Sequence, residues 1–275
     1  MTHPLKLLQA GFVRRVAPGL ATLVLPILLV ACGGNGSTGE ATRSVNATPN
    51  VVVEGAWSGT NSLGNVFDML LLEDGSSYQV FGNLNAGVFS ATGLDYGRYG
   101  VSGNILSATL TQYNPVGSKF PGSLAATVVA GSSINGVGGS SLTGLRVSFI
   151  AAPSGSNHPG YDYNTAAQLS DIAGAWSSVL VVEQNIGLTL SIDGSTGALQ
   201  GVGSGCTLGG SIQPRSSHKN VFDVTMTLGP APCLHPGQSY SSVAMSYRTG
   251  TSQHQLVAGL VSPDKTLGTV LYALR

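Results

Sequence analysis

The stretch Gly55-Ala56-Trp57-Ser58 recurs as Gly174-Ala175-Trp176-Ser177, 119 residues further along the chain. The same spacing relates Asp74-Gly75-Ser76 to Asp193-Gly194-Ser195. The chain of 275 residues contains only 2 Trp, so a gap-free recurrence of both segments is difficult to attribute to chance. Self-similarity at a fixed period is typical of repeated structural units. We therefore expect the body of the protein to consist of two tandem copies of one module.

The later parts of the two copies match at a different spacing. Gly131 and Ser148 correspond to Gly229 and Ser246 at a distance of 98 residues. The shorter spacing predicts that the first copy holds 21 extra residues, in the stretch 83–103.

Both copies alternate apolar and polar residues as β-strands do. Phe67–Leu72 leads into Glu73-Asp74-Gly75, which is typical of a hairpin turn, and Tyr78–Phe81 follows it. Val221–Leu228 alternates: one face carries Phe222, Val224, Met226 and Leu228, and the other carries Val221, Asp223, Thr225 and Thr227. Outside the first 32 residues, no segment keeps a convincing helical period. The sequence therefore predicts an all-β protein with about eight short strands in each copy.

Sheets with many short antiparallel strands protect their edges by closing into barrels or stacking as sandwiches. We expect two tandem antiparallel up-and-down barrel-like modules. The predicted parts are a signal peptide at 1–31, a flexible tether at 32–50, a first β module at 51–155, a linker at 156–173 and a second β module at 174–275.

The first residues form an export signal. Lys6, Arg14 and Arg15 precede an uncharged run, 16–31, which ends in Leu29-Val30-Ala31-Cys32. This arrangement resembles the lipobox of bacterial lipoproteins. The resemblance implies that the Cys32 thiol receives a diacylglyceryl group and that cleavage leaves Cys32 as the first residue. The alternative is an ordinary cysteine in an uncleaved anchor.

The residue after Cys32 is Gly33. In the sorting rule of Gram-negative lipoproteins, Asp at this position favours retention in the inner membrane, so the resemblance implies the outer membrane. We expect the protein to be anchored by lipid to the outer membrane and to face either the periplasm or the outside. Two or three acyl chains hold a protein stably in a membrane.

Composition and charge exclude several classes of protein. The chain has 12 Lys+Arg and 12 Asp+Glu, with 9% charged and 42% hydrophobic residues. Without residues 1–31, 9 basic and 12 acidic side chains remain, a formal charge of −3. A balance of this kind argues against a nucleic-acid partner, which requires a concentrated cationic face. The apolar content of the chain argues against an intrinsically disordered protein.

Gly55 with Trp57, and Gly174 with Trp176, place Gly-x-Trp at the start of each copy. This pattern resembles the opening of calycin barrels, the group of lipocalins and avidins, in which the Trp closes one end of the barrel. The chain departs from avidins because 2 Trp cannot build the aromatic box around biotin. It also shows no clear second lipocalin motif. The resemblance implies a barrel, but not a lipocalin or avidin ligand.

A transmembrane β-barrel is the alternative architecture. Spanning strands need about 10 residues with a continuous lipid-facing side, and the strands expected here are shorter. The chain also ends in Leu274-Arg275 rather than in an aromatic residue, and a lipobox argues against barrel insertion.

Cys206 and Cys233 are the two cysteines that remain besides Cys32. Because an oxidising compartment favours disulfides, we expect these two to be joined. The alternative is a metal site that includes His235, but a second pair of ligands is lacking. We expect no metal ion and no cofactor.

The sequence carries no recognised catalytic motif. It has no Gly-x-Ser-x-Gly in the mature part, no HExxH and no P-loop. We therefore expect no enzymatic activity. The less favoured alternative, a periplasmic hydrolase, requires His218 or His254 to converge with Asp193 or Asp223.

Tyr161 and Tyr163 lie in a polar and aromatic loop and are candidate binding residues, because Tyr makes adaptable contacts. Alternatively, their rings pack on a barrel rim. The leading hypothesis is non-enzymatic binding or adhesion, with an unknown protein or small-molecule ligand. It predicts an apolar cavity inside one module, or an exposed aromatic patch near Tyr161. The second hypothesis is a structural envelope scaffold with filled modules.

Overall fold

The computed structural model describes residues 49–85, 88–114, 117–249 and 253–275. The expected signal peptide, Cys32 and nearly all of the expected tether lie outside these residues. Among the residues described, no helix has the length and apolar character needed to cross a membrane.

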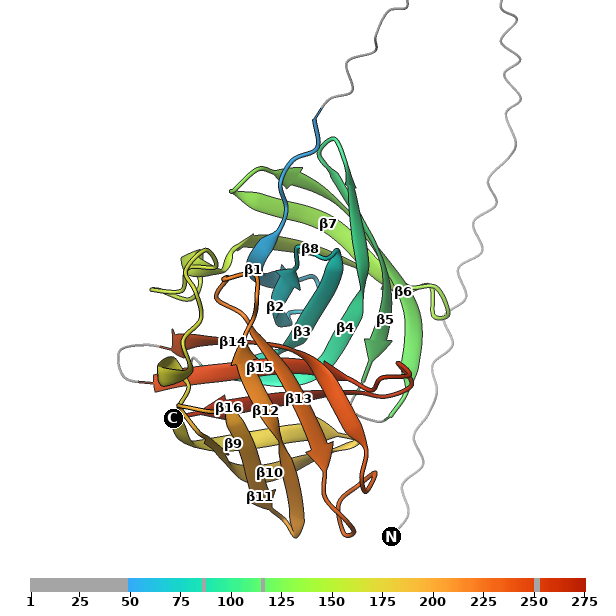
Figure 1. The fold of residues 1–275 in the computed structure, drawn as a ribbon. Helices are drawn as coiled ribbons and strands as arrows, with labels where there is room; N and C mark the ends of the chain where they lie inside the picture. Colours follow the sequence, from blue (N-terminus) through green and yellow to red (C-terminus); the bar gives the residue numbers. More distant parts are fainter. Residues whose placement is uncertain (1–48, 86–87, 115–116, 250–252) are drawn as a thin grey trace, which may run out of the picture. The chain divides into compact units, whose positions relative to one another are not determined.

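Sixteen antiparallel strands form two closed barrels in tandem, as predicted (Figure 1). Within each barrel, strands adjacent in sequence pair with each other, and closure comes from β1 pairing with β8 and β9 pairing with β16. Closure of this kind leaves no unpaired sheet edge.

The strands of the first barrel are β1 (Gly55–Asn61), β2 (Val66–Leu71), β3 (Ser76–Asn85), β4 (Val88–Ser102), β5 (Ile105–Tyr113), β6 (Lys119–Val129), β7 (Ser133–Ser140) and β8 (Arg146–Pro153). The strands of the second barrel are β9 (Gly174–Val182), β10 (Gln184–Ile192), β11 (Ala198–Gly203), β12 (Cys206–Pro214), β13 (Phe222–Leu228), β14 (Ser239–Thr249), β15 (Gln253–Val261) and β16 (Gly268–Leu274). Between the barrels lie two short 3-10 turns, η1 (Ser154–Ser156) and η2 (Leu169–Asp171).

The two barrels correspond strand by strand at a nearly constant spacing. Strand β9 begins 119 residues after β1, and β16 ends 121 residues after β8. The predicted spacing of 98 residues and the 21-residue insertion are therefore wrong. Gly131 follows β6, the sixth strand of its barrel, whereas Gly229 follows β13, the fifth strand of the other. Because glycine and serine recur in many hairpins, short matches between them aligned non-equivalent turns.

The repeated Asp-Gly segments form equivalent turns. In the first barrel, the Asp74 carboxylate accepts a hydrogen bond of 2.8 Å from the Ser76 backbone N–H. In the second, Asp193 accepts one of 2.9 Å from the Ser195 backbone N–H. Asx-type turn chemistry thus explains both aspartates without a catalytic role.

The repeated tryptophans also occupy equivalent positions, and both are buried. Trp57 donates its indole N–H to the Val53 carbonyl at 2.9 Å, and Trp176 donates to the Ile172 carbonyl at 2.8 Å. Trp57 pairs with Pro153, the last residue of β8, so its ring packs inside the barrel near one end.

The two barrels belong to one compact unit, which includes the described residues from 49 onward. Strands β3 and β4 of the first barrel contact β15 and β16 of the second. Leu94 on β4 is completely buried there, and it lies so close to Gly259 that a Cβ on this glycine would come within 2.6 Å of Leu94 Cδ1. The outer faces of β3 and β4 therefore contribute apolar side chains, including Val80 and Leu94, to the boundary between the barrels.

Candidate functional site

The first barrel contains a cavity of about 200 Å³. Part of its lining comes from the β1–β2 and β7–β8 hairpins, at the opposite end from Trp57. Its walls are mainly apolar, and the lining side chains include Gln79, Phe81, Asp95, Gln112, Phe120 and Phe149.

A row of paired residues runs around the wall of this cavity. Strand register places Gln79 opposite Asp95, Asp95 opposite Gln112, and Gln112 opposite Phe120. The row continues from Gln79 to Met69 and then to Trp57. Because side chains opposite each other on one face are neighbours, the carboxyl of Asp95 lies between two amides inside the barrel.

The corresponding row of the second barrel is entirely apolar. Starting from Trp176, the register leads through Leu190, Gly201, Leu208 and Leu228. Of these, the three leucines and Trp176 belong to one buried cluster that fills the second barrel. The fold therefore accommodates an apolar row at this level, and the polar row is specific to the first barrel.

Asp95 is electrostatically unusual. Burial raises its pKa from the usual 3.8 to about 7, and the neighbouring Gln112 amide opposes this shift only in part. The side chain is enclosed by the barrel but is partly accessible from the cavity. A carboxyl group of this kind changes its charge near neutral pH, and perturbed groups in cavities are candidates for functional sites.

The open end of the cavity has an ordered and partly apolar rim. The Asn61 side chain accepts hydrogen bonds from the backbone N–H groups of Leu63, at 3.0 Å, and Asn65, at 3.1 Å, which holds the β1–β2 hairpin. Leu63 and Leu145 line the cavity at this rim and are 60% and 50% exposed. Exposed leucines at a cavity entrance suit the passage of an apolar ligand.

A larger hollow, of about 430 Å³, lies on the outside of β1 and β2 beside β14 and β15. At its base the Tyr247 hydroxyl donates to Asp68 Oδ2 at 2.7 Å, and His158 Nε2 lies 2.6 Å from Asp68 Oδ1. The His158 and Tyr247 rings stack with their centroids 3.6 Å apart. Burial, followed by the Asp68 charge, raises the pKa of Tyr247. Both oxygens of Asp68 thus have partners within the protein, which indicates a structural lock between the barrels.

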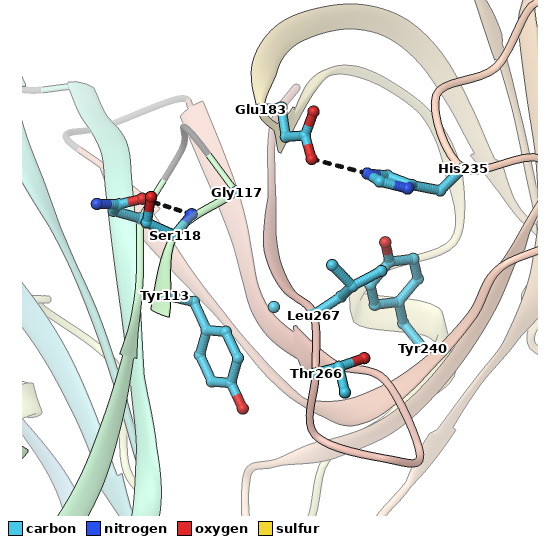
Figure 2. Close-up of a pocket in the computed structure, with 10 residues that line it drawn as sticks. Tyr113, Gly117, Ser118, Glu183, His235, Tyr240, Thr266 and Leu267 are labelled. Atoms are coloured by element: carbon cyan, nitrogen blue, oxygen red, sulfur yellow. Dashed lines mark hydrogen bonds and ion pairs between the residues drawn. The ribbon is translucent and has the colours of Figure 1, made fainter. Parts of the chain in front are cut away.

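A third hollow is a small crevice lined by loops of both barrels. Figure 2 shows Tyr113, Gly117 and Ser118 from the first barrel opposite residues of the second, where His235 Nε2 lies 3.0 Å from Glu183 Oε1. Its volume of about 10 Å³ is at most that of one water molecule. The crevice is therefore too small to be a ligand site.

The predicted disulfide between Cys206 and Cys233 is confirmed, with the two Cα atoms 4.5 Å apart. It joins the start of β12 to the loop between β13 and β14. His235, which the alternative placed with these cysteines in a metal site, pairs with Glu183. In the described part of the chain, no group of three or more His, Cys, Asp or Glu side chains is arranged to hold a metal ion.

Tyr161 and Tyr163 do not form an exposed aromatic patch, which corrects that expectation. Both are buried, at 6% and 8% exposure. The Tyr161 hydroxyl donates to the Asn220 carbonyl at 2.7 Å, and that of Tyr163 donates to Glu54 Oε1 at 3.2 Å. Their rings belong to the apolar cluster that the two barrels share, so they act as packing residues.

Both aspartates that a hydrolase would need have other partners. Asp193 closes its own turn, and Asp223 accepts a 2.6 Å hydrogen bond from Arg215. His254 pairs through its backbone with Arg275. Burial, followed by nearby arginines, lowers the pKa of His254. His218 lies in a turn with a φ of 58°.

Gln79, Asp95 and Gln112 were not among the predicted site residues. Only Gln79 lay in a predicted strand, where a single polar residue normally indicates an outward-facing side chain.

Comparisons with known proteins gave distant structural similarities and no family. A scan against protein-family models and a search of curated proteins both gave no match. Among solved structures, the chain is similar to a DUF3598-family protein of unknown function from Nostoc punctiforme, with 13% identity, a TM-score of 0.25 and coverage of 80% of this chain and 93% of that one. It is also similar to a candidate outer membrane protein from Bacteroides fragilis, with 10% identity, a TM-score of 0.23 and coverage of 83% and 96%.

Proposed function

We propose that this protein is anchored by lipid to the outer membrane and binds a small ligand in its first barrel, without catalysing a reaction. One observation carries the proposal: the first barrel holds an open cavity of about 200 Å³, whereas the apolar cluster of the second barrel fills the same level. Ligand sites are typically concave, mostly apolar and equipped with a few polar groups. A scaffold role, the alternative, accounts for the filled barrel but not for the hollow one.

The anchor is part of the proposal. The lipobox resemblance at Cys32 supports attachment by acyl chains, and two or three chains give stable binding. The Gly- and Ser-containing stretch that follows, 33–49, would give the barrels reach away from the membrane surface. The cavity would then sample ligands in the space beside the membrane.

The test measures binding of octan-1-ol by titration calorimetry, with Cys32→Ser in every chain so that no acyl chain of the protein competes for the cavity. Gly138→Leu introduces a side chain into the cavity, because Gly138 lines it and pairs with the inward-facing Leu124. The backbone tolerates this change, since the nearest atom to a Cβ at Gly138 is 3.7 Å away.

The matched control is Gly100→Leu. Gly100 lies on the exposed outer side of β4 in the same barrel, and a Cβ there meets nothing within 4 Å. We expect saturable binding of one molecule per chain, lost in Gly138→Leu and retained in Gly100→Leu. The proposed function is rejected if neither octan-1-ol nor its charged analogues, described below, bind the parent chain.

A further inference from the structure

Asp95 is the only ionisable side chain among the described residues that line the cavity of the first barrel. Gln79 and Gln112 flank it, and the remaining walls are apolar or carry neutral polar groups. A ligand that enters this cavity therefore meets one acidic group and two amides, with no cation on the wall.

The second barrel shows that the fold does not need these polar groups. Leu208 of the second barrel corresponds to Asp95 when the two rows are aligned at Trp57 and Trp176. Placing a carboxyl group and two amides inside a barrel costs free energy unless they find partners. Leucine would avoid that cost. We therefore attribute the polar row to a bound ligand that the second barrel does not take.

We infer that the cavity takes a ligand with a small apolar body and a cationic amino head, and that the head binds the carboxylate of Asp95 between Gln79 and Gln112. The inference rests on the proposed function and specifies its ligand class. An ammonium group donates hydrogen bonds to the carboxylate and to the amide oxygens, and contacts of this kind with charged partners are stronger than neutral ones.

The size of the cavity limits the body of the ligand. An apolar cavity of about 150 Å³ holds one benzene molecule, so a cavity of about 200 Å³ corresponds to about eight to ten non-hydrogen atoms. Phe81, Phe120 and Phe149 line it and offer aromatic surface to an alkyl chain or a ring. A cation near such rings gains further attraction.

The same geometry disfavours a carboxylate ligand. The anion of a fatty acid would face the Asp95 carboxylate with no Lys or Arg among the described lining residues to balance the two charges. Like charges in an enclosed site repel strongly. A neutral alcohol of equal length fits the apolar walls but gains no charge-assisted bond.

The ionisation of Asp95 predicts how the affinity for an amine depends on pH. Burial raises the pKa of Asp95 to about 7, and no charged side chain is among the causes of the shift. The groups that face it from the adjacent strands β3 and β5 are the uncharged Gln79 and Gln112. Above neutral pH the carboxylate is available for a cation, and below it the proton removes the charge. Affinity for an amine therefore rises with pH, whereas affinity for an alcohol does not change.

The experiment compares octylamine, octan-1-ol and octanoate, which share one apolar body, by calorimetry at about pH 8. The parent chain carries only Cys32→Ser, and the variants add Asp95→Asn, Gly138→Leu or Gly100→Leu. We expect octylamine to bind about 10- to 100-fold more tightly than octan-1-ol, and octanoate to bind most weakly. Asp95→Asn should remove the preference for the amine over the alcohol.

The outcomes separate the two proposals. If none of the three compounds binds, the proposed function fails, and the inference fails with it. If octan-1-ol or octanoate binds as tightly as octylamine, or if Asp95→Asn retains the preference for the amine, the cavity binds ligands but the inference is wrong. Octylamine binding that persists in Gly138→Leu would place the site elsewhere and also overturn the inference.

Discussion

Replacing Asp95 with asparagine should stabilise the protein, and the gain should grow with pH. The folded pKa is about 7, against a usual value of 3.8. Between these values the folded protein keeps a proton that the unfolded chain has released, so stability falls as pH rises. At about 1.4 kcal/mol for each pH unit, the carboxyl costs about 4 kcal/mol above neutral pH. At this position the Asp95→Asn chain has no pH-dependent cost, because asparagine does not ionise.

The assay is urea unfolding of the parent and Asp95→Asn chains at several pH values, with the free energies of unfolding subtracted at each pH. Subtraction cancels the carboxyl groups that both chains share. We expect the difference to rise by about 3 kcal/mol between pH 5 and pH 8. Gln79→Leu is the control, because it changes a neighbouring polar group in the same cavity without removing a charge. Its difference should be independent of pH. A flat difference curve for Asp95→Asn would refute the low-polarity environment on which the amine selectivity depends.

Three further predictions address the rest of the chain. The Cys206–Cys233 disulfide closes a separation of 27 residues, so a double Cys→Ser variant should lose about 3–4 kcal/mol of unfolding free energy; a variant with the unfolding curve of the parent contradicts this. Tyr247→Phe deprives the buried Asp68 of a 2.7 Å hydrogen bond and should cost about 1–3 kcal/mol, seen as a lower melting temperature; an unchanged temperature means that the bond contributes nothing. The intact mass of protein purified from membranes should show acyl chains on an amino-terminal Cys32, and Cys32→Ser should carry none; an uncleaved parent chain without lipid disproves the anchor.

The barrel architecture could be predicted because it depends on local patterns. Val221–Leu228 alternates cleanly, and Phe222 lies in the cluster that fills the second barrel, on the face that the pattern assigned to it. The Asp-Gly turns and the recurrence of Trp57 at Trp176 gave the repeat. These signals need no knowledge of which strands pair.

The polar row of the first barrel could not be predicted, because the outer face of β4 is also buried. Leu94 is completely buried against the second barrel, whereas Asp95 points into the cavity of the first. An alternating strand is normally interpreted with its apolar residues inward, and this rule assigns Leu94 and Asp95 to the wrong faces. The row also depends on the register of several strands, and a slip of one residue reverses the face of each side chain.

The buried outer face of β4 also explains how a hollow barrel is supported. A cavity removes packing contacts and weakens a barrel, and the first barrel regains apolar contact through the outer face that carries Leu94. Arg215 adds ion pairs across the same boundary, at 2.9 Å to Glu73 and 3.0 Å to Asp74. Burial alone would raise the pKa of Asp74, but hydrogen bonds from Ser76 and the Arg215 charge lower it, so its contribution to stability is lost only as pH falls into the acid range. The filled barrel thus supports the hollow one, in whose cavity we propose that a ligand binds.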